Sequence, residues 1–115
     1  MMMRTPSSGW FPRRGEVYSV RHDKRERVAV ISADAINRYA LDVCVAPITS
    51  VKRPNFSLRV PVNPPQGGLA RPSWAKCDQV TTLEKTHLVY PPFGRLTDVT
   101  LEAIGQGIKL ALQLP

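Results

Sequence analysis

Two apolar stretches of this chain carry phosphate-binding residue types at their ends. The first begins with Arg27, which four apolar residues follow, and the second runs from residue 43 to Thr49 and Ser50. Apolar runs of this length are typical of β-strands. In neighbouring antiparallel strands, the start of one lies beside the end of the other. The spacing therefore predicts a guanidinium and hydroxyls in one place, which suits a phosphodiester.

One phosphodiester reaction that needs no metal is cleavage of RNA by its own 2′-hydroxyl. That reaction needs removal of the hydroxyl proton, stabilisation of charge on the pentavalent phosphorus and protonation of the departing 5′-oxygen. Arg27 suits the second task, because a guanidinium stays ionised and its fork holds two phosphate oxygens. From spacing alone, a strand-end arginine that pairs with Glu26 or Asp42 is the simpler interpretation.

Thr49 and the loop before Arg27 supply the remaining candidates for chemistry. A threonine hydroxyl is a poor base, so we expect Thr49 to position the substrate and help electrostatically. The alternative is a turn threonine whose oxygen bonds the local backbone. His22, Asp23 and Glu26 are all candidates for proton transfer, and imidazole exchanges protons most readily near neutral pH. The general acid and base stay open among these three.

Basic residues bracket the two candidate catalytic residues. Lys24 and Arg25 precede Arg27, and Lys52 and Arg53 follow Thr49 and Ser50. Cations that flank one groove neutralise the phosphates of a bound strand. We expect these four side chains, with the Ser50 hydroxyl, to bind RNA.

Asp78 and Gln79 lie near the end of another strand-like stretch, residues 73–80. Their side chains suit the edges of unpaired bases, because RNA sequence is read mainly where bases are splayed out. A solvent-facing polar strand surface explains them equally well. Both interpretations stay open.

Size and charge limit the class of protein. The chain has 115 residues, enough for one compact domain, and a formal net charge of +7 that favours a polyanionic partner. Eleven of the sixteen Lys and Arg lie in residues 1–59, so we expect the first half to carry the polyanion face. Cys44 and Cys77 fit reduced core thiols, and no clustered metal ligands are visible, so no cofactor or metal is expected. Without a signal peptide or membrane span, a cytoplasmic protein is predicted.

The pattern of apolar residues predicts a mainly β fold. Residues 1–12 lack periodicity and are expected to form a loose arm, with a single domain over 13–115. Thr97 is a plausible N-cap for a C-terminal amphipathic helix, in which Gly105 and Gly107 require close packing. The predicted strands are 16–21, 27–32, 42–48, 56–62, 73–80 and 87–90, separated by turn-forming residues that include 34–37 and 91–94. So few strands favour a small curled barrel.

The chain resembles the MazF/PemK family of toxin endoribonucleases. The resemblance is carried by residues 14–18, 27–50 and 73–83 and by the C-terminal helix. The resemblance implies an SH3-like antiparallel β-barrel with a C-terminal helix, assembled as a homodimer. Arg27 and Thr49 stand at the family's catalytic positions. The activity implied is sequence-specific, metal-independent cleavage of single-stranded RNA that leaves a 2′,3′-cyclic phosphate and a 5′-hydroxyl. A small antitoxin with an acidic, flexible segment is the implied partner.

Two other functions fit the same fold. One is a non-enzymatic gyrase poison, whose relatives depend on a C-terminal aromatic residue, whereas this chain has no aromatic after Phe93. The other is a nucleic-acid-binding barrel without catalysis, which would retain RNA but not cut it.

Overall fold

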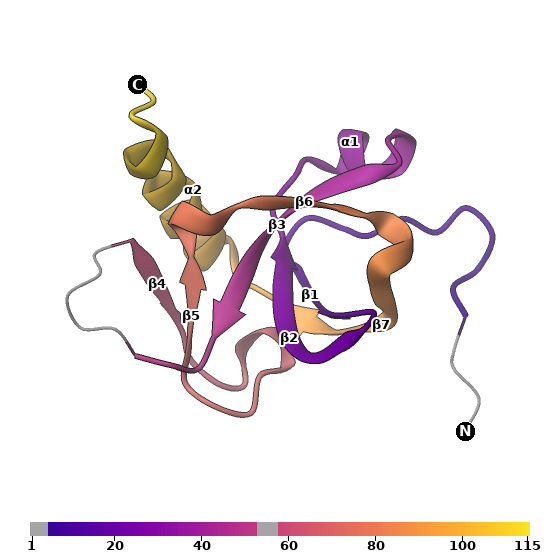
Figure 1. Ribbon diagram of the computed structural model, residues 1–115, viewed down its shortest axis with the longest axis horizontal. Helices are drawn as coiled ribbons and strands as arrows, with labels where there is room; N and C mark the ends of the chain where they lie inside the picture. Colours follow the sequence, from indigo (N-terminus) through magenta and orange to yellow (C-terminus); the bar gives the residue numbers. More distant parts are fainter. Residues whose placement is uncertain (1–4, 53–57) are drawn as a thin grey trace.

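The computed structural model of the chain describes residues 5–52 and 58–115, and for Lys24 the backbone alone. The strands form one curled antiparallel sheet in the order β4-β5-β3-β2-β1-β7, and β6 pairs with the first half of β3 (Figure 1). The strands are β1 Glu16–Val20, β2 Asp23–Val30, β3 Asp42–Thr49, β4 Arg59–Val62, β5 Ser73–Lys76, β6 Thr81–Glu84 and β7 Leu88–Arg95. The helices are α1 Asp34–Tyr39 and α2 Asp98–Leu112, with 3-10 turns η1 Gln66–Gly68, η2 Cys77–Gln79 and η3 Lys85–His87.

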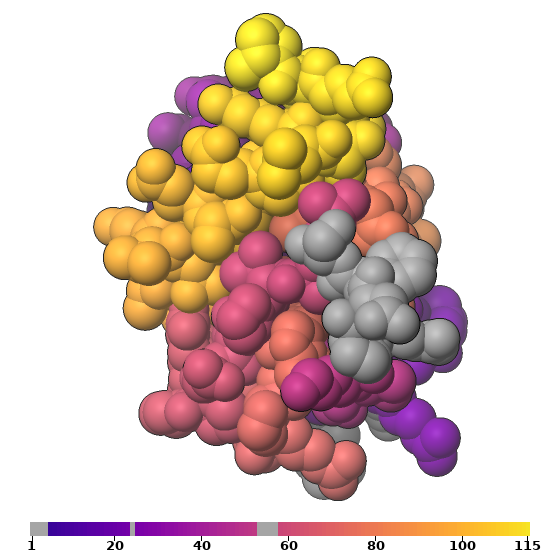
Figure 2. Space-filling view, turned by 90° about the vertical axis from the view of Figure 1, so that its left-hand side faces the viewer, coloured from indigo at the N-terminus to yellow at the C-terminus, as the bar shows by residue number. Residues whose placement is uncertain are grey.

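This arrangement confirms the predicted fold class, a mainly β, small SH3-like antiparallel barrel with a C-terminal helix. The barrel is open, because the sheet path ends at β4 and β7 within the part of the chain that is described. Helix α2 packs on β4 and η2 at one end of the sheet. Figure 2 shows that face, with α2 above the β4 and η1 segments.

Several predicted element boundaries are wrong. The stretch 73–80 is a strand only to Lys76 and then becomes η2, while β6 and the short helix α1 were not predicted. The stretch 91–94 was predicted as a turn, yet β7 runs through its two prolines. Both prolines lie between Val89 and Gly94, where the register of β7 against β1 shifts, and proline is tolerated at such a bulge because the ladder is interrupted there. Of the predicted strand 56–62, residues 56 and 57 lie outside the described residues.

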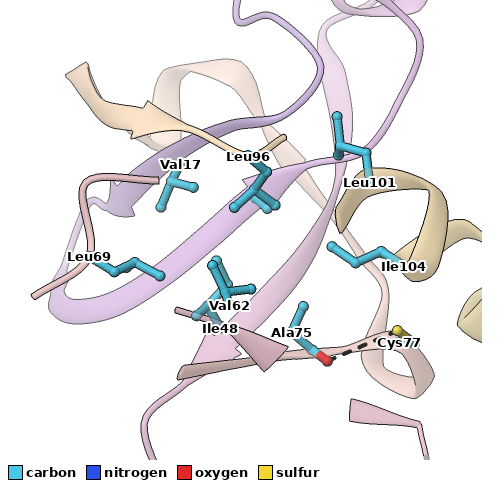
Figure 3. Packing of buried hydrophobic residues seen from close by; sticks show 10 residues of the cluster. Val17, Ile48, Val62, Leu69, Ala75, Cys77, Leu96, Leu101 and Ile104 are labelled. Atoms are coloured by element: carbon cyan, nitrogen blue, oxygen red, sulfur yellow. Dashed lines mark hydrogen bonds between the residues drawn. The ribbon is translucent and has the colours of Figure 1, made fainter. Parts of the chain in front are cut away.

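Apolar clusters cover both faces of the sheet. One contains Ala29 and Ile48 and extends to α2 (Figure 3), and the other contains Val28, Val30 and Val45. Successive side chains of a strand point to opposite faces, so β2 supplies both clusters from adjacent residues. This two-sided burial explains the continuous apolar run that follows Arg27.

Part of the predicted N-terminal arm packs on the domain. Trp10 meets Tyr18 and Tyr90 edge to face, with ring centroids 6.2 and 5.9 Å away, and Pro12 is buried. The Tyr18 hydroxyl donates to Glu16 Oε1 at 2.9 Å, and burial raises the pKa of Tyr18. The packed domain therefore includes residues from Trp10 onward.

Helix α2 begins and packs as its sequence predicts. The Thr97 hydroxyl accepts a hydrogen bond from the Thr100 amide at 3.2 Å, which caps the first turn. Leu101 and Ile104 lie in the core cluster that β2 and β3 share. Neither helix of the described chain is long and apolar enough to cross a membrane.

The two glycines of α2 differ in what surrounds them. A Cβ on Gly107 would lie 2.6 Å from the sulfur of Cys77, whereas a Cβ on Gly105 would meet nothing within 4 Å. Cys77 is buried, and burial raises the pKa of its thiol. Gly107 therefore packs closely, as expected, whereas Gly105 makes no close contact within the chain.

We predict that Gly107→Ala lowers the free energy of unfolding by about 1–3 kcal/mol, because the added methyl overpacks the contact with Cys77. Gly105→Ala is the matched control and should raise it by roughly 0.5–1 kcal/mol, because alanine favours the helix. Urea denaturation of both variants measures the difference. Equal stability of the two variants would contradict the packing described for Gly107.

Candidate functional site

A row of directly opposed residues places Arg27 in the middle of the sheet. Arg27 pairs with Ile48 of β3 on one side and with Ser19 of β1 on the other, and Ser19 pairs with Val89 of β7. Directly opposed residues project from the same face of a sheet. The side chains of Ile48, Arg27, Ser19 and Val89 therefore follow one another across four strands.

An irregularity in β2 marks the start of this row. The register between β1 and β2 shifts after Ser19 and Arg27, so that Val20 pairs with Asp23 and residues 24–26 are extra on β2. Extra residues of this kind bend a strand and redirect its side chains. Arg25 and Arg27 consequently line the same hollow of the surface.

The guanidinium of Arg27 lies against an aromatic ring. Its central carbon is 4.2 Å from the ring centroid of Phe93 on β7, and its Nη1 donates to the Glu26 carbonyl at 3.3 Å. The pairing with Asp42 considered from sequence is contradicted, because Asp42 opens β3 and Arg27 lies beside its other end. Arg27 is half-buried and keeps part of its surface exposed.

Two hollows meet at Arg27. The β5 hollow, about 560 Å³, is lined by Arg25, Arg27, Ile48, Ser50, Leu69, Ala70, Arg71 and Ser73. The β7 hollow, about 790 Å³, is lined by Ser19, Val20, Arg21, His22, Arg27, Val89 and Phe93. No carboxylate is among these lining residues. The two hollows together, called the trough below, thus present four arginines, and such a surface attracts a polyanion.

A close backbone contact holds the far wall of the trough. A Cβ on Gly68 would lie 2.1 Å from the carbonyl oxygen of Phe93, and one on Gly94 would lie 2.6 Å from the Gly68 nitrogen. Gly68 also has a φ of +71°, which favours glycine. This contact joins the segment that leads to Arg71, in the β5 hollow, to the strand that carries Phe93, in the β7 hollow.

Ser50, rather than Thr49, lines the β5 hollow. Thr49 follows Ile48 and leaves the pleat on the opposite face, where it pairs with Trp74. Its Oγ1 accepts a hydrogen bond from the Val51 amide at 3.1 Å, as expected of the turn threonine considered above. A catalytic part for Thr49 stays a prediction.

The other predicted binding residues divide into two groups. Arg25 and Ser50 line the β5 hollow, and exposed Lys52 lies two residues beyond Ser50. Asp78 and Gln79 are exposed in η2, beyond the end of β5 that is remote from Ser73, and line neither hollow. Lys24 belongs to β2 by its backbone, and Arg53 lies outside the described residues.

Of the three candidates for proton transfer, only His22 lines the trough. It occupies the connection between β1 and β2 with a φ of +74° and faces the β7 hollow that Arg27 shares. Asp23 Oδ1 accepts from the Arg25 amide at 3.2 Å, which fixes the start of β2. Glu26 is exposed and lines neither hollow.

Residues of the trough that sequence reasoning missed include Ser19, Arg21, Arg71, Ser73 and Phe93. Ser73 had a signal, since it opens a strand-like stretch, and its hydroxyl donates to the Arg71 carbonyl at 2.9 Å. Phe93 followed two prolines that indicated a turn. Arg71 reaches the site only because the glycine contact brings its segment to β7, which no local pattern shows.

The sequence matches a known protein family over most of its length. The family described as "PemK-like, MazF-like toxin of type II toxin-antitoxin system" matches residues 13–112. The chain belongs to this MazF-like toxin family. A comparison with curated proteins found no match.

Solved structures of MazF-like proteins are similar to this chain over most of its length. An "Endoribonuclease from Mycobacterial species" is 26% identical, with 95% of this chain and 98% of that chain covered and a TM-score of 0.80. "Mycobacterium tuberculosis toxin MazF-mt6" is 27% identical, with 87% and 98% covered and a TM-score of 0.76. A MazE-MazF structure from Deinococcus radiodurans, 15% identical with 92% and 100% covered and a TM-score of 0.75, shares the fold.

We predict that Arg71→Ala weakens binding of single-stranded RNA and lowers the slope of log affinity against log salt by about 0.7, because one phosphate contact is lost. Arg25→Ala should act alike. Arg38→Ala is the matched control, since Arg38 is exposed on α1 and lines neither hollow. Its guanidinium carbon lies 5.3 Å from the ring centroid of Tyr39. Fluorescence anisotropy over a salt series measures the slopes. An unchanged slope for Arg71→Ala and Arg25→Ala would show that RNA binds elsewhere.

Proposed function

We propose that this chain is a metal-independent endoribonuclease that cuts single-stranded RNA and leaves a 2′,3′-cyclic phosphate and a 5′-hydroxyl. The supporting observation is the position of Arg27, which lines both hollows, and the described residues that line them with it include no carboxylate. Relatives named as endoribonucleases support the class of activity. The alternative of a barrel that binds RNA without cutting it is an outcome of the assay below.

Arg27 is proposed to stabilise the transition state. When the 2′-oxygen attacks phosphorus and the bond to the 5′-oxygen breaks, negative charge gathers on the non-bridging oxygens. A guanidinium donates to two such oxygens at once and is already in place before the charge develops. The stack on Phe93 and the bond to the Glu26 carbonyl hold Arg27 for this task.

Arg25, Arg71 and the two serines of the β5 hollow are proposed to bind the phosphates that flank the cut. The arginines neutralise charge, and Ser50 and Ser73 line the same hollow. Thr49 is proposed to act on Ser50 through the turn, because its oxygen accepts from the Val51 amide and so fixes the chain on either side of Ser50.

His22 is proposed to act as the base of the reaction. It lines the β7 hollow beside Arg27, whereas Asp23 and Glu26 line neither hollow. As base, this imidazole accepts the 2′-hydroxyl proton, and the departing 5′-oxygen, which lies on the opposite side of phosphorus in an in-line displacement, takes its proton from water. Variants of Asp23 and Glu26 therefore serve as matched controls for a variant of His22.

An acidic antitoxin segment is the proposed partner, and the protein is proposed to act in the cytoplasm as a homodimer. The cationic trough would attract such a segment, and one relative was solved as an "Endoribonuclease in complex with its cognate antitoxin". On α2, the exposed side chains of Val99 and Leu110 suit a second copy. Light scattering tests the dimer, and competition between an acidic peptide and RNA tests the partner surface.

We predict that Arg27→Ala lowers the rate of RNA cleavage in EDTA by about 100-fold to 1,000-fold, because the developing charge loses its donors. The assay follows a long RNA and maps the new ends. Kinase should label the 5′ ends without prior dephosphorylation, and the 3′ ends should ligate through a 3′-hydroxyl only after the cyclic phosphate is opened and the phosphate is removed. Arg38→Ala should cut at the wild-type rate.

No cleavage by the wild-type protein, with RNA still bound, would leave a binding barrel in place of a nuclease. Equal cleavage by Arg27→Ala would reject the mechanism. In the same assay, Thr49→Ser should keep the hydrogen bond from the Val51 amide and the wild-type cleavage rate. Thr49→Val removes that hydrogen bond and should lower the cleavage rate. A wild-type rate for Thr49→Val would remove Thr49 from the mechanism.

We predict that His22→Gln lowers the cleavage rate by about 100-fold or more, because proton transfer by a positioned side chain is worth that much. Asp23→Asn and Glu26→Gln should stay within about tenfold of the wild-type rate, because neither carboxylate reaches the trough. Single-turnover rates across pH measure the three variants. A large loss for Glu26→Gln with none for His22→Gln would transfer the role to the carboxylate.

A further inference from the structure

The two hollows that meet at Arg27 differ in the chemistry of their walls. The β5 hollow brings three arginines and two serines together, which suits phosphate groups. In the β7 hollow, Val20, Val89 and Phe93 form apolar walls, and polar groups come from Ser19, Arg21, His22 and the shared Arg27. Apolar walls with a few polar groups are typical of a pocket for a flat organic ring rather than for phosphate alone.

Phe93 is fixed while its ring stays accessible. Its backbone cannot move away without breaking the close contact between Gly68 and Gly94, in which the Phe93 carbonyl takes part. The residue is nevertheless 44% exposed, although a phenylalanine is usually buried and the Arg27 guanidinium lies over one face of the ring. An exposed aromatic ring on a tightly packed backbone, beside a hollow, is the kind of surface on which nucleic-acid bases stack.

We propose that the β7 hollow binds an unpaired nucleobase next to the phosphate held by Arg27, with Phe93 as its stacking wall. Because Arg27 lines both hollows, a base in one hollow belongs to a nucleotide adjoining the phosphate at Arg27. Ser19, Arg21 and His22 then face the edge of that base, where donors and acceptors determine which base fits. Phe93 thereby positions Arg27 and contributes to base selection.

This inference takes its substrate class from the proposed ribonuclease function, but a binding measurement tests it without cleavage. The probe is a fluorescein-labelled RNA nonanucleotide selected from a random pool for tight binding to the wild-type protein, with 2′-deoxyribose at any nucleotide that is cut. A series of derivatives carries one abasic nucleotide at each position in turn. The affinity of each derivative is compared between wild type and Phe93→Leu.

For the wild-type protein, we expect one abasic position to weaken binding by roughly tenfold or more, because the stacked base is lost. For Phe93→Leu, the same abasic change should cost less than about twofold, because the stacking wall is already absent. Phe93→Trp should restore the dependence, which a merely structural role for Phe93 would not predict. Phe11→Leu is the matched control, since Arg13 lies 3.7 Å above the Phe11 ring and Phe11 lines neither hollow.

The result that would overturn the inference is equal loss for wild type and Phe93→Leu at every abasic position. That outcome with efficient cleavage by the wild type would leave the nuclease proposal standing and remove the base subsite. Loss of the abasic dependence in Phe93→Leu, with no cleavage by the wild type, would leave the base subsite standing and remove the nuclease proposal. The two failures are therefore distinguishable.

Discussion

The row of opposed residues that crosses β3, β2, β1 and β7 is the constraint on which the site depends. Because Arg27 lies between Ile48 and Ser19 in this row, its side chain must leave the sheet on the face where both hollows lie. A slip of the register by one residue would send the guanidinium to the other face and put Val28 in its place. Clusters of apolar side chains on both faces of the sheet hold that register.

Local contacts then refine the position that the register sets. The stack of Arg27 on Phe93 contributes only about 0.5–1 kcal/mol at a partly exposed site, so it selects among orientations of the guanidinium and adds little to stability. The contact of Gly68 with Gly94 holds the backbone of Phe93, whose ring does this. Through the same contact the segment carrying Arg71 reaches the trough, so one packing feature serves both hollows.

Elements that a local apolar pattern marks could be predicted from the sequence. The apolar run after Arg27 revealed β2, and Thr97 with the helical spacing after it revealed α2. Thr49 and Ser50 show the limit, because which of two successive residues faces the site is a question of pleat and register that no local pattern decides. Asp78 and Gln79 were placed on a strand that ends at Lys76, and Phe93 was hidden by prolines that the bulge between β7 and β1 tolerates.

A crystal structure of the protein with an uncleavable RNA, carrying 2′-deoxyribose at the cut nucleotide, tests the central claim most directly. The account predicts a phosphate whose non-bridging oxygens accept hydrogen bonds from the Arg27 guanidinium, at about 2.7–2.9 Å, with the strand lying along the trough. An RNA bound at another face, with Arg27 making no contact to phosphate, would contradict it.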